Sequence, residues 1–364
     1  MKIAVVAGTR PELIRLSLIL KKLREQFCVR LIHTGQNYDK NLNDIFFKEL
    51  DIKPPEYNLG IKTSNFGEQV GTILTKVDEI LRKEKPDKVL ILGDTNSALS
   101  SIIAEKLKIP VFHMEAGNRC HNREVPEEIN RKLVDSISSY NLPYTQLSKE
   151  NLINDGIPKE RIFVTGNPIY EVLKYHNDKI DESDILTKLK LTEKEYFLAT
   201  FHRAENVDNK STLRHILHSL CFLGQMKKQP IICSVHPRTK QKIEEFGIEI
   251  DKEWVKLCEP FGLFDFIKLE KNCSVVISDS GTVSEDACIL RVPNVIIRDA
   301  TERLEVIECG ASILAGTREM DIYEAVKFML TKNTNWAIPE GYLYPDVSER
   351  VCSILRGVYK WVAK

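Results

Sequence analysis

The chain has 364 residues, more than a single hydrophobic core usually supports, so two domains of about 150–200 residues each are expected. Its 52 basic and 52 acidic residues give a formal net charge of zero at pH 7, which argues against a global field that attracts nucleic acid or an anionic membrane. Any anionic ligand must therefore be held by local groups.

The nine cysteines are an odd number, contain no CxxC spacing and lie mostly in apolar runs. This pattern is typical of reduced thiols in a cytosolic protein and not of a disulfide framework or a zinc site. The segment 1–8 is too short for a signal peptide, and no apolar stretch reaches the roughly 20 residues that span a bilayer. We therefore expect a soluble, cytoplasmic protein without a metal ion, a nucleic-acid partner or a membrane partner.

Short apolar runs alternate with amphipathic helical stretches along the first half of the chain. The predicted strands are 2–7, 29–33, 88–92, 111–115 and 162–165. The predicted helices are 11–26, 41–50, 66–84, 96–107 and 127–137. Such alternation predicts right-handed βαβ units and a parallel sheet covered by helices on both faces.

A polar, charged stretch at about 174–194 interrupts this pattern, which then starts again. The second set of predicted strands is 196–201, 230–235, 255–258, 274–278 and 294–298. The predicted helices are 209–225, 237–245, 263–271, 282–290 and 321–331. The fold class is therefore α/β, with two doubly wound, Rossmann-like domains.

We place the first domain at 1–167 and the second at 168–345. The segment 346–364 carries apolar residues at helical spacing, and we expect this last helix to pack back on the first domain.

The first turn between a strand and a helix runs from Gly8 to Arg15. Gly8 allows a tight turn, and Pro11 suits the first position of a helix. Free backbone N–H groups and the helix dipole favour an anion there, to which Arg10 and Arg15 add positive charge. The turn lacks both GxGxxG and a P-loop pattern, so neither a nicotinamide cofactor nor a P-loop is expected. The alternative is a structural turn with two solvated arginines, and the turn alone does not decide between them.

Acidic residues follow two predicted strands. Asp94 comes directly after the apolar run 88–93, and Glu115 lies at the end of the next strand, with Glu127 shortly behind. In an open α/β sheet the carboxyl ends of the strands are where ligands bind. The two strands therefore deliver acids to one crevice, as general acid/base chemistry requires. This arrangement indicates an enzyme.

A second anion site is predicted where the apolar run 274–277 opens into a helix. Ser280, Gly281 and Thr282 can offer hydroxyl and backbone N–H groups to a phosphate. Asp286, one turn later, can accept hydrogen bonds from a ribose diol, as can its neighbour Glu285. The alternative is an ordinary helix cap in which Ser280 serves only the backbone, and the sequence chemistry leaves both open.

Further candidate ligands end neighbouring strands of the second domain. Arg303 can contribute a cation, and His202 can donate to a phosphate or a leaving oxygen. His236 ends the strand beside that of His202. In contrast, His215 and His218 lack a third ligand nearby in sequence and are interpreted as structural or surface residues.

Eight motifs together carry a family resemblance. They are GTRPELIRLS at 8–17, HTGQNYD at 33–39, GDTNS at 93–97, HMEAGNR at 113–119, PEEINR at 126–131, FHRAEN at 201–206, SDSGT at 278–282 and TERLE at 301–305. In this order they resemble the non-hydrolysing UDP-N-acetylglucosamine 2-epimerases. The resemblance implies a GT-B architecture, in which two Rossmann-like domains hold a UDP-sugar between them without a cofactor, usually as a homodimer.

The resemblance also assigns roles to individual residues. It implies that Asp94, Glu115 and Glu127 match the catalytic carboxylates and that His202 matches the catalytic histidine. The implied UDP-binding positions are Arg10, Arg15, Ser280, Gly281, Thr282, Asp286 and Arg303, with Gln36 and His236 as further regulatory or substrate contacts.

Carbon 2 of an N-acetylhexosamine is not acidic, so removal and return of its proton has no electron sink. The resemblance implies that UDP-GlcNAc and UDP-ManNAc interconvert by elimination of UDP to a 2-acetamidoglycal and re-addition on the opposite face. Asp94, Glu115 and Glu127 would then share the proton transfers, while Arg10 and His202 stabilise the departing diphosphate.

Several positions depart from the usual family pattern. Asp286 stands where Glu is more usual, and Arg15 stands where Lys is common. SGT replaces SGG, TERLE replaces TERPE, and the segment between Arg119 and Pro126 is short. IRLS, HTGQNYD, GDTNS and AGNRC resemble a branch that acts on modified UDP-hexosamines for surface polysaccharides, such as 6-deoxy-L-hexosamines or diacetamido sugars.

Three alternatives belong to other classes. A GT-B glycosyltransferase would use the same fold and UDP site but usually needs one base and not three acids. A UDP-sugar-binding regulatory module would keep the phosphate site and tolerate loss of Asp94 and Glu115. A hydrolysing relative would release free ManNAc and UDP.

Overall fold

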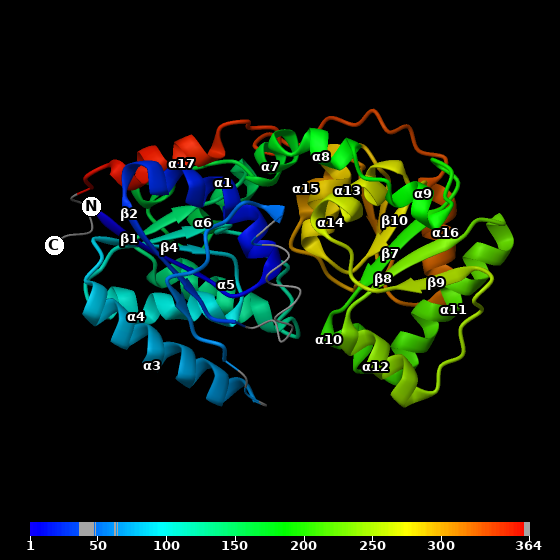
Figure 1. Ribbon diagram of the computed structural model, residues 1–364, viewed down its shortest axis with the longest axis horizontal. Helices are drawn as coiled ribbons and strands as arrows, with labels where there is room; N and C mark the ends of the chain where they lie inside the picture. The colour runs from blue at the N-terminus through cyan, green and yellow to red at the C-terminus, as the bar shows by residue number, and fades with distance from the viewer. Residues whose placement is uncertain (36–46, 48, 62, 64, 360–364) are drawn as a thin grey trace. The chain divides into compact units, whose positions relative to one another are not determined.

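The computed structural model describes residues 1–35, 47, 49–61, 63 and 65–359. The chain divides into two compact units, which we call unit 1 (Met1–Tyr175 with Glu340–Lys364) and unit 2 (His176–Pro339). Each unit contains one six-stranded sheet with helices packed on it (Figure 1).

The sheet of unit 1 has the strand order β3-β2-β1-β4-β5-β6, and every pairing in it is parallel. The strands are β1 Lys2–Ala7, β2 Cys28–His33, β3 Tyr57–Asn58, β4 Lys88–Leu92, β5 Val111–Met114 and β6 Tyr140–Leu142. The order reverses direction between β1 and β4. Loops leaving such a switch point diverge to opposite faces and open a crevice at the carboxyl ends of the strands.

Helices cover both faces of this sheet. They are α1 Arg10–Gln26, α3 Phe66–Glu84, η1 Asn96–Ser100, α4 Ser101–Lys106, α5 Pro126–Ile137, α6 Gln146–Asn154, η2 Lys159–Arg161, α7 Ile169–Tyr175 and α17 Val347–Arg356. Figure 1 shows α1 and α17 on one face and α3, α4 and α5 on the other. On the latter face, Ile73 and Val77 of α3 pack with Val89 and Ile91 of β4 in one buried cluster.

The C-terminal helix α17 packs on α1, the first helix of the chain. Lys22 of α1 pairs with Glu349 of α17 at 2.8 Å. Lys88 Nζ, at the start of β4, donates to the carbonyl oxygens of Leu355 and Gly357, each at 2.6 Å. These contacts attach the end of the chain to the sheet of unit 1.

The sheet of unit 2 repeats this topology, with the parallel order β12-β11-β10-β7-β8-β9. The strands are β7 Phe197–Phe201, β8 Ile231–Val235, β9 Val255–Cys258, β10 Val276–Ser278, β11 Asn294–Ile296 and β12 Ser312–Leu314. The order reverses between β7 and β10, which places the loops after these two strands at the switch point.

The helices of unit 2 are α8 Asn177–Asp181, α9 Ile185–Leu189, α10 Ala204–Val207, α11 Lys210–Lys227, α12 Pro237–Phe246, α13 Leu263–Asn272, α14 Gly281–Leu290, α15 Leu304–Glu308 and α16 Glu319–Met329. Leu217 and Leu220 of α11 and Val326 of α16 join one buried cluster with the strands. Leu269 of α13 and Ala287 of α14 belong to a second cluster. The α/β class with two doubly wound sheets is therefore confirmed.

The predicted elements differ from the observed ones in several places. The predicted strand 162–165 is wrong: Ile162 forms only an isolated bridge to Asn141, and the sixth strand is instead β6. β3 and β12 were not predicted, and the charged stretch 174–194 contains the short helices α8 and α9. The predicted helix 41–50 lies mostly outside the described residues.

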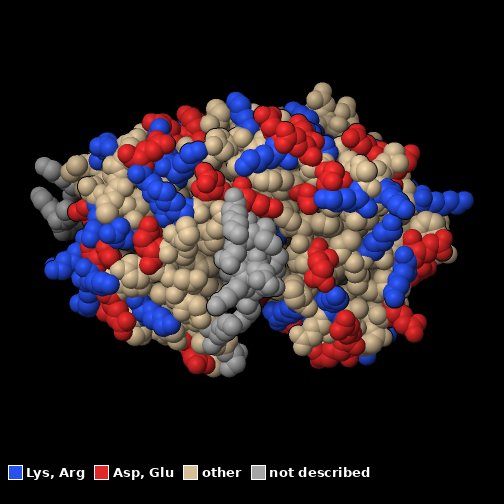
Figure 2. All heavy atoms as spheres, viewed as in Figure 1, with Lys and Arg blue, Asp and Glu red and all other residues tan. Residues whose placement is uncertain are grey.

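Basic and acidic side chains are interspersed over the face of each unit seen in Figure 2, as the balanced composition leads one to expect. No helix in the described part of the chain is long and apolar enough to cross a membrane.

Candidate functional site

The turn after β1 contains a glycine at which a side chain would clash with its neighbours. A Cβ atom at Gly8 would lie 2.0 Å from Ser97 Oγ, well inside contact distance. Thr9 is the N-cap of α1 in an extended backbone conformation, and Arg10 and Pro11 begin the helix. The predicted tight turn leading into a helix is therefore confirmed.

A buried carboxyl group, Glu12, occupies part of the predicted anion site. Its Oε2 accepts hydrogen bonds from the backbone N–H groups of Gly8 at 2.5 Å and Thr9 at 3.2 Å, which completes a capping box. These two N–H groups are therefore not free for a phosphate, contrary to our expectation. Burial raises the pKa of Glu12 to about 7, against the opposing effect of hydrogen bonds from Gly8, Thr95 and Thr9.

The two arginines of this turn differ in their surroundings. Arg10 is half-buried, and burial lowers its pKa to about 10 against the opposing charge of Glu49. Arg15 is buried, with 2% of its surface exposed, so the alternative of a solvated side chain is wrong at this position. Arg10 and the helix dipole therefore remain as the attractions for an anion at this turn.

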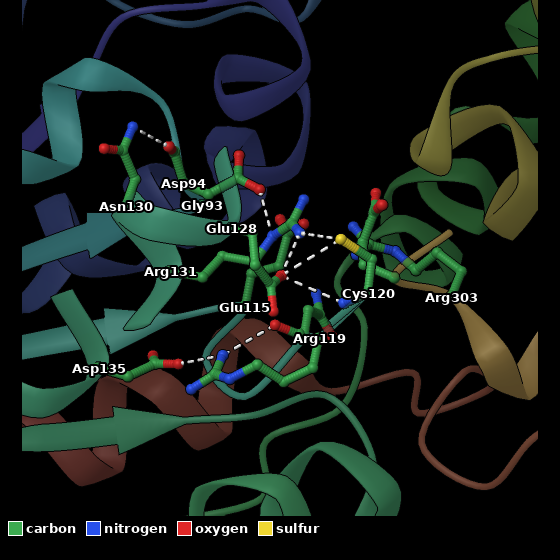
Figure 3. A network of polar contacts seen from close by, with 12 residues as sticks. Gly93, Asp94, Glu115, Arg119, Cys120, Glu128, Asn130, Arg131, Asp135 and Arg303 are labelled. Atoms are coloured by element: carbon green, nitrogen blue, oxygen red, sulfur yellow. Dashed lines mark hydrogen bonds and ion pairs between the residues drawn. The ribbon is translucent and has the colours of Figure 1, made fainter. Parts of the chain in front are cut away.

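Asp94, the first predicted acid, is held by helix α5. Arg131 Nε donates to Asp94 Oδ2 at 2.7 Å, and Asn130 Nδ2 donates to the main-chain oxygen of Asp94 at 2.9 Å (Figure 3). Both partners come from α5. Since 24% of the side chain is exposed, Asp94 is fixed in place but still accessible.

Glu115, the second predicted acid, has an unusual backbone. Its φ is 64°, in the left-handed region that residues other than glycine rarely occupy. Tyr144 Oη donates to its Oε2 at 3.4 Å, and a Cβ atom added at Gly93 would lie 3.8 Å from the same oxygen. The carboxyl group of Glu115 therefore lies beside the Gly93–Asp94 turn. Such uncommon conformations occur often at functional sites.

The two adjacent glutamates of α5 have different environments. Glu128 is buried and accepts hydrogen bonds from the N–H groups of Cys120 and His121, at 3.1 and 3.2 Å, and from Arg131 at 2.9 Å. Burial alone would raise the pKa of Glu128, but these hydrogen bonds outweigh it and hold the pKa below its ordinary value. Glu127, the predicted catalytic acid, is half-buried in the first turn of the helix. Arg131 thus joins Asp94 to Glu128, as Figure 3 shows.

Behind Glu115 lies a buried ionic network that the sequence did not reveal. His113 Nδ1 lies 2.8 Å from Asp135 Oδ1, and His113 Nε2 lies 2.8 Å from the carbonyl oxygen of Gly93. Asp135 Oδ2 pairs with Arg119 at 2.7 Å. His113, Asp135 and Arg119 are each about 1% exposed. The only sequence signal for this network was the polar composition of the quoted motif 113–119.

In unit 2, the loop after β10 is organised by Asp279, which is fully buried. Its carboxylate accepts the N–H groups of His202 and Arg203, and Asn206 Nδ2, at 3.0 to 3.2 Å. Ser280, the next residue, is the N-cap of α14. Asp279 therefore joins the two loops at the switch point of the sheet.

The start of α14 is closely packed. A Cβ atom at Gly281 would lie 2.5 Å from Glu302 Oε1, so a larger residue there would displace the Glu302 carboxylate. Ser280 Oγ and Thr282 Oγ1 share a hydrogen bond of 2.9 Å, and Ser280 forms no side-chain bond to the helix backbone. The interpretation of Ser280 as an ordinary side-chain cap is therefore wrong.

The remaining predicted ligands of unit 2 are less accessible. Glu285 and Arg303 form a buried ion pair, so the positive charge of Arg303 is largely compensated. Asp286 is also buried, with 7% of its surface exposed.

His202 and His236 follow the adjacent strands β7 and β8. The His202 side chain is 53% exposed, with Nδ1 3.7 Å from Asp279 Oδ1. His236 caps α12, because its Nδ1 accepts the N–H of Arg238 at 3.2 Å. The remaining prediction, Gln36, lies outside the described residues.

Each unit therefore presents polar side chains at the carboxyl ends of strands beside a switch point. These are Arg10, Asp94 and Glu115 in unit 1, and His202, His236 and Ser280 in unit 2. Unit 1 therefore offers acid/base groups beside a helix start, and unit 2 offers a histidine beside a helix start that suits an anion, a combination that an enzyme acting on an anionic substrate can use.

The chain belongs to the UDP-N-acetylglucosamine 2-epimerase family, since the profile of that family matches residues 21–356. It is 44% identical over 351 residues to a UDP-N-acetylglucosamine 2-epimerase of Methanocaldococcus jannaschii, covering 94% of this chain and 95% of the relative. A crystal structure of the M. jannaschii enzyme with UDP-GlcNAc and UDP matches with a TM-score of 0.92 and 42% identity, covering 98% of this chain and 99% of that one. The GT-B-like two-domain fold is thus confirmed.

A relative with another substrate is also similar. The UDP-2,3-diacetamido-2,3-dideoxy-D-glucuronate 2-epimerase of Pseudomonas aeruginosa is 34% identical, covering 98% of this chain and 99% of that protein.

Proposed function

We propose that this protein is a non-hydrolysing UDP-N-acetylglucosamine 2-epimerase, an isomerase that interconverts UDP-GlcNAc and UDP-ManNAc. The observation that carries the proposal is the pair of acids Asp94 and Glu115. They lie at the carboxyl ends of the adjacent strands β4 and β5, in a chain that belongs to the 2-epimerase family. Epimerisation at carbon 2 needs acid/base groups close to each other, and this arrangement provides them.

The reaction proceeds by elimination and re-addition. One acid/base group removes the proton from carbon 2 while the bond from carbon 1 to the UDP oxygen breaks, which leaves a 2-acetamidoglycal. UDP then adds back to carbon 1, and carbon 2 receives a proton on its opposite face. Asp94, Glu115 and Glu127 divide these proton transfers among them. Arg131, which pairs with Asp94 at 2.7 Å, holds that carboxylate in place for its part in these transfers.

The departing diphosphate requires positive charge and hydrogen-bond donors. Arg10 is the candidate in unit 1, supported by the dipole of the 17-residue helix α1. In unit 2 the candidates are His202 and the start of α14 at Ser280 and Gly281. Residues of both units then bind the same UDP-sugar. Thr282, Asp286 and Arg303 are the further candidates for UDP binding that the family resemblance implies.

Incubation with UDP-GlcNAc in D₂O tests the function directly. The proposal requires formation of UDP-ManNAc with deuterium at carbon 2. Mass spectrometry and proton NMR measure this product. Release of free ManNAc would instead indicate a hydrolysing enzyme, and transfer to an acceptor without deuterium would indicate a glycosyltransferase.

A second candidate is a 2-epimerase of a modified UDP-hexosamine, which the similarity to the P. aeruginosa diacetamido-glucuronate epimerase favours. Comparing kcat/KM for UDP-GlcNAc with that for its 6-deoxy and 3-acetamido derivatives distinguishes the two. A preference of at least about 10-fold, equivalent to about 1.4 kcal/mol, would assign the substrate.

The cellular setting is part of the same proposal. All nine cysteines are free thiols, which is typical of a reducing compartment such as the cytoplasm. We place the product in surface polysaccharide synthesis and the enzyme in a homodimer, as its family resemblance implies. Light scattering coupled to size-exclusion chromatography measures the oligomeric state.

A further inference from the structure

We propose that His113, held as an imidazolium by Asp135, is the positioning residue that fixes Asp94 and Glu115 relative to each other and keeps Glu115 ionised. This inference rests on the proposed function, because it assigns these acids to the epimerase reaction. It adds a residue that the family motifs did not single out as functional.

The protonation state of His113 follows from its hydrogen-bond partners. Its Nε2 lies 2.8 Å from the Gly93 carbonyl oxygen, which can only accept, so Nε2 carries a proton. Its Nδ1 lies 2.8 Å from Asp135 Oδ1. Asp135 Oδ2 faces the Arg119 guanidinium at 2.7 Å and the Gly117 N–H at 3.1 Å, so the carboxyl group is ionised and Nδ1 must be the donor. Both ring nitrogens therefore carry protons.

The same contacts connect the two acid-bearing loops. The Gly93 carbonyl immediately precedes Asp94, and His113 is two residues before Glu115 on β5. A single imidazolium therefore sets the separation between the end of β4 and the end of β5.

Asp135 fixes the backbone of Glu115 from both sides. It binds the His113 ring, two residues before Glu115, and the Gly117 N–H, two residues after it. Glu115 itself has the uncommon φ of 64°. A left-handed conformation in a residue other than glycine costs about 1–3 kcal/mol and persists only when the surroundings enforce it. The Asp135 carboxylate is the group that enforces it here.

The charges facing His113 show the direction of its electrostatic effect. Asp135 comes from α5, Arg119 from the loop after β5, and Asp94 and Glu115 from the ends of the two strands. Asp155, 37% exposed, pairs with Arg119 at the surface. The net charge of the three fully buried side chains is +1, from His113, Arg119 and Asp135. The His113 imidazolium attracts the negative charge of Glu115.

Burial alone would lower the pKa of His113, but Asp135 and, to a smaller extent, the charge of Glu115 outweigh it and raise the pKa above its ordinary value. Because such coupling is reciprocal, the imidazolium in turn stabilises the charged form of Glu115. Burial would raise the pKa of Asp135, but His113 and Arg119 hold it below its ordinary value.

The first experiment measures the protonation state of His113 without substrate. Long-range ¹H–¹⁵N correlation spectra of the histidine-labelled full chain, assigned with His113→Gln, should show both ring nitrogens of His113 protonated well above the ordinary histidine pKa of about 6.5. In Asp135→Asn, the His113 ring should lose its second proton near the ordinary histidine pKa of about 6.5 and be neutral above it. A neutral His113 ring in the wild-type protein would overturn the inference.

The second experiment separates positioning from mere packing. His113→Gln keeps a donor toward the Gly93 carbonyl but has no charge, and His113→Phe lacks both. We expect kcat to fall about 10-fold in the first and about 10²-fold or more in the second, with KM changed far less, on the scale of general acid/base effects. In His113→Gln and Asp135→Asn, the acid limb of kcat/KM against pH should move to higher pH, because Glu115 loses its stabilising cation. His218→Gln, on the exposed face of α11, is the matched control and should change neither.

Equal losses in the Gln and Phe variants with an unshifted pH profile would show that His113 only packs, and the inference would fail. Absence of turnover of every UDP-hexosamine by the wild-type protein would instead reject the proposed function, together with the catalytic part of the inference. The two failures are therefore distinguishable.

Discussion

Carboxylates in unit 1 take different roles because their partners differ. Glu128 is buried and accepts hydrogen bonds from two backbone N–H groups and from Arg131, so it is a structural anion. Glu12 is buried with the N–H groups of a helix cap. Asp94 pairs with an arginine but remains partly exposed, and Glu115 is half-buried and accepts a hydrogen bond from Tyr144. Acid/base catalysis requires a carboxyl group that can exchange a proton with the substrate. This requirement favours Asp94 and Glu115.

The first prediction concerns these two acids. Asp94→Asn and Glu115→Gln keep the size of the side chain but cannot exchange a proton in the same way. We expect kcat to fall at least about 10²-fold in each, in the range for general acid/base groups, with UDP affinity little changed. Initial rates of epimerisation and calorimetric UDP binding measure this. Glu79→Gln, at an exposed position of α3, is the control, and near-normal turnover in both variants would assign the acids to structure.

The second prediction concerns Glu12, whose pKa is raised from 4.5 to about 7, chiefly by burial. A folded-state pKa above the unfolded value means that the folded state binds more protons between these pH values. Stability is therefore greatest below about pH 4.5 and falls as pH rises toward 7. At about 1.36 kcal/mol per pKa unit, this one group contributes a loss of about 3 kcal/mol.

Glu12→Gln should remove that slope, so the difference in unfolding free energy between variant and wild type should change with pH. Urea titrations at several pH values between 4.5 and 7 measure it. Parallel curves for the two proteins would mean that Glu12 does not titrate in this range.

The sequence predicted the location of the acids better than their individual roles. Asp94 and Glu115 follow apolar runs that had to be strands, so their place at the sheet edge followed from the pattern. Glu127 and Glu128 are adjacent on a helix, so their side chains point about 100° apart. The motif alone does not tell which of the two faces the interior. Likewise, His113 and Asp135 are 22 positions apart, and only the packing of α5 on β5 brings them together.

At the scale of elements, long periodic helices and buried strands were predicted well, and short elements were not. β6 has only three residues, Tyr140–Leu142, too few to show a period. The region 162–165 looked like a strand because Phe163 and Thr165 donate along the edge of β6, to the carbonyl oxygens of Asn141 and Pro143, without forming a regular ladder. In the stretch 174–194, Ile180 and Ile185 are the buried residues of α8 and α9, so the charged majority concealed both helices.

A prediction at this scale concerns the attachment of α17. Lys88 Nζ donates to the carbonyl oxygens of Leu355 and Gly357 and lies 5.1 Å from the centroid of the Phe112 ring. Lys88→Met keeps the aliphatic stem but leaves these carbonyl groups at the end of the helix without the donor. We expect a loss of about 1–3 kcal/mol in unfolding free energy, the scale of hydrogen bonds to a charged group.

Hydrogen exchange should locate that loss, with faster exchange at the last turn of α17 than in the rest of unit 1. The control Lys83→Met removes an exposed lysine of α3. Unchanged exchange in α17 would show that its packing on α1 alone holds the helix.

At the scale of the whole molecule, the chain contains the same doubly wound topology twice, and the two units carry different chemistry. Unit 1 contributes acids at the ends of β4 and β5, whereas unit 2 contributes an exposed histidine and the start of α14. Neither set is sufficient for elimination and re-addition, because proton transfer at carbon 2 and departure of UDP from carbon 1 belong to one step. The proposed reaction therefore requires both units to bind one substrate.

The last prediction tests that requirement through UDP affinity. Arg10→Ala in unit 1 should weaken UDP binding by about 1.5–3 kcal/mol, the scale of a lost charge-assisted hydrogen bond, or about 10- to 100-fold in Kd. Ser280→Ala in unit 2 should weaken it less, because backbone N–H groups at the start of α14 remain available. Arg82→Ala, on an arginine that is 64% exposed, is the control for loss of charge from unit 1. Isothermal titration with UDP measures all three. If Arg10→Ala binds UDP as well as the wild type while Ser280→Ala is impaired, the nucleotide is held by unit 2 alone, and Arg10 must then act on the sugar or on the structure of its own turn.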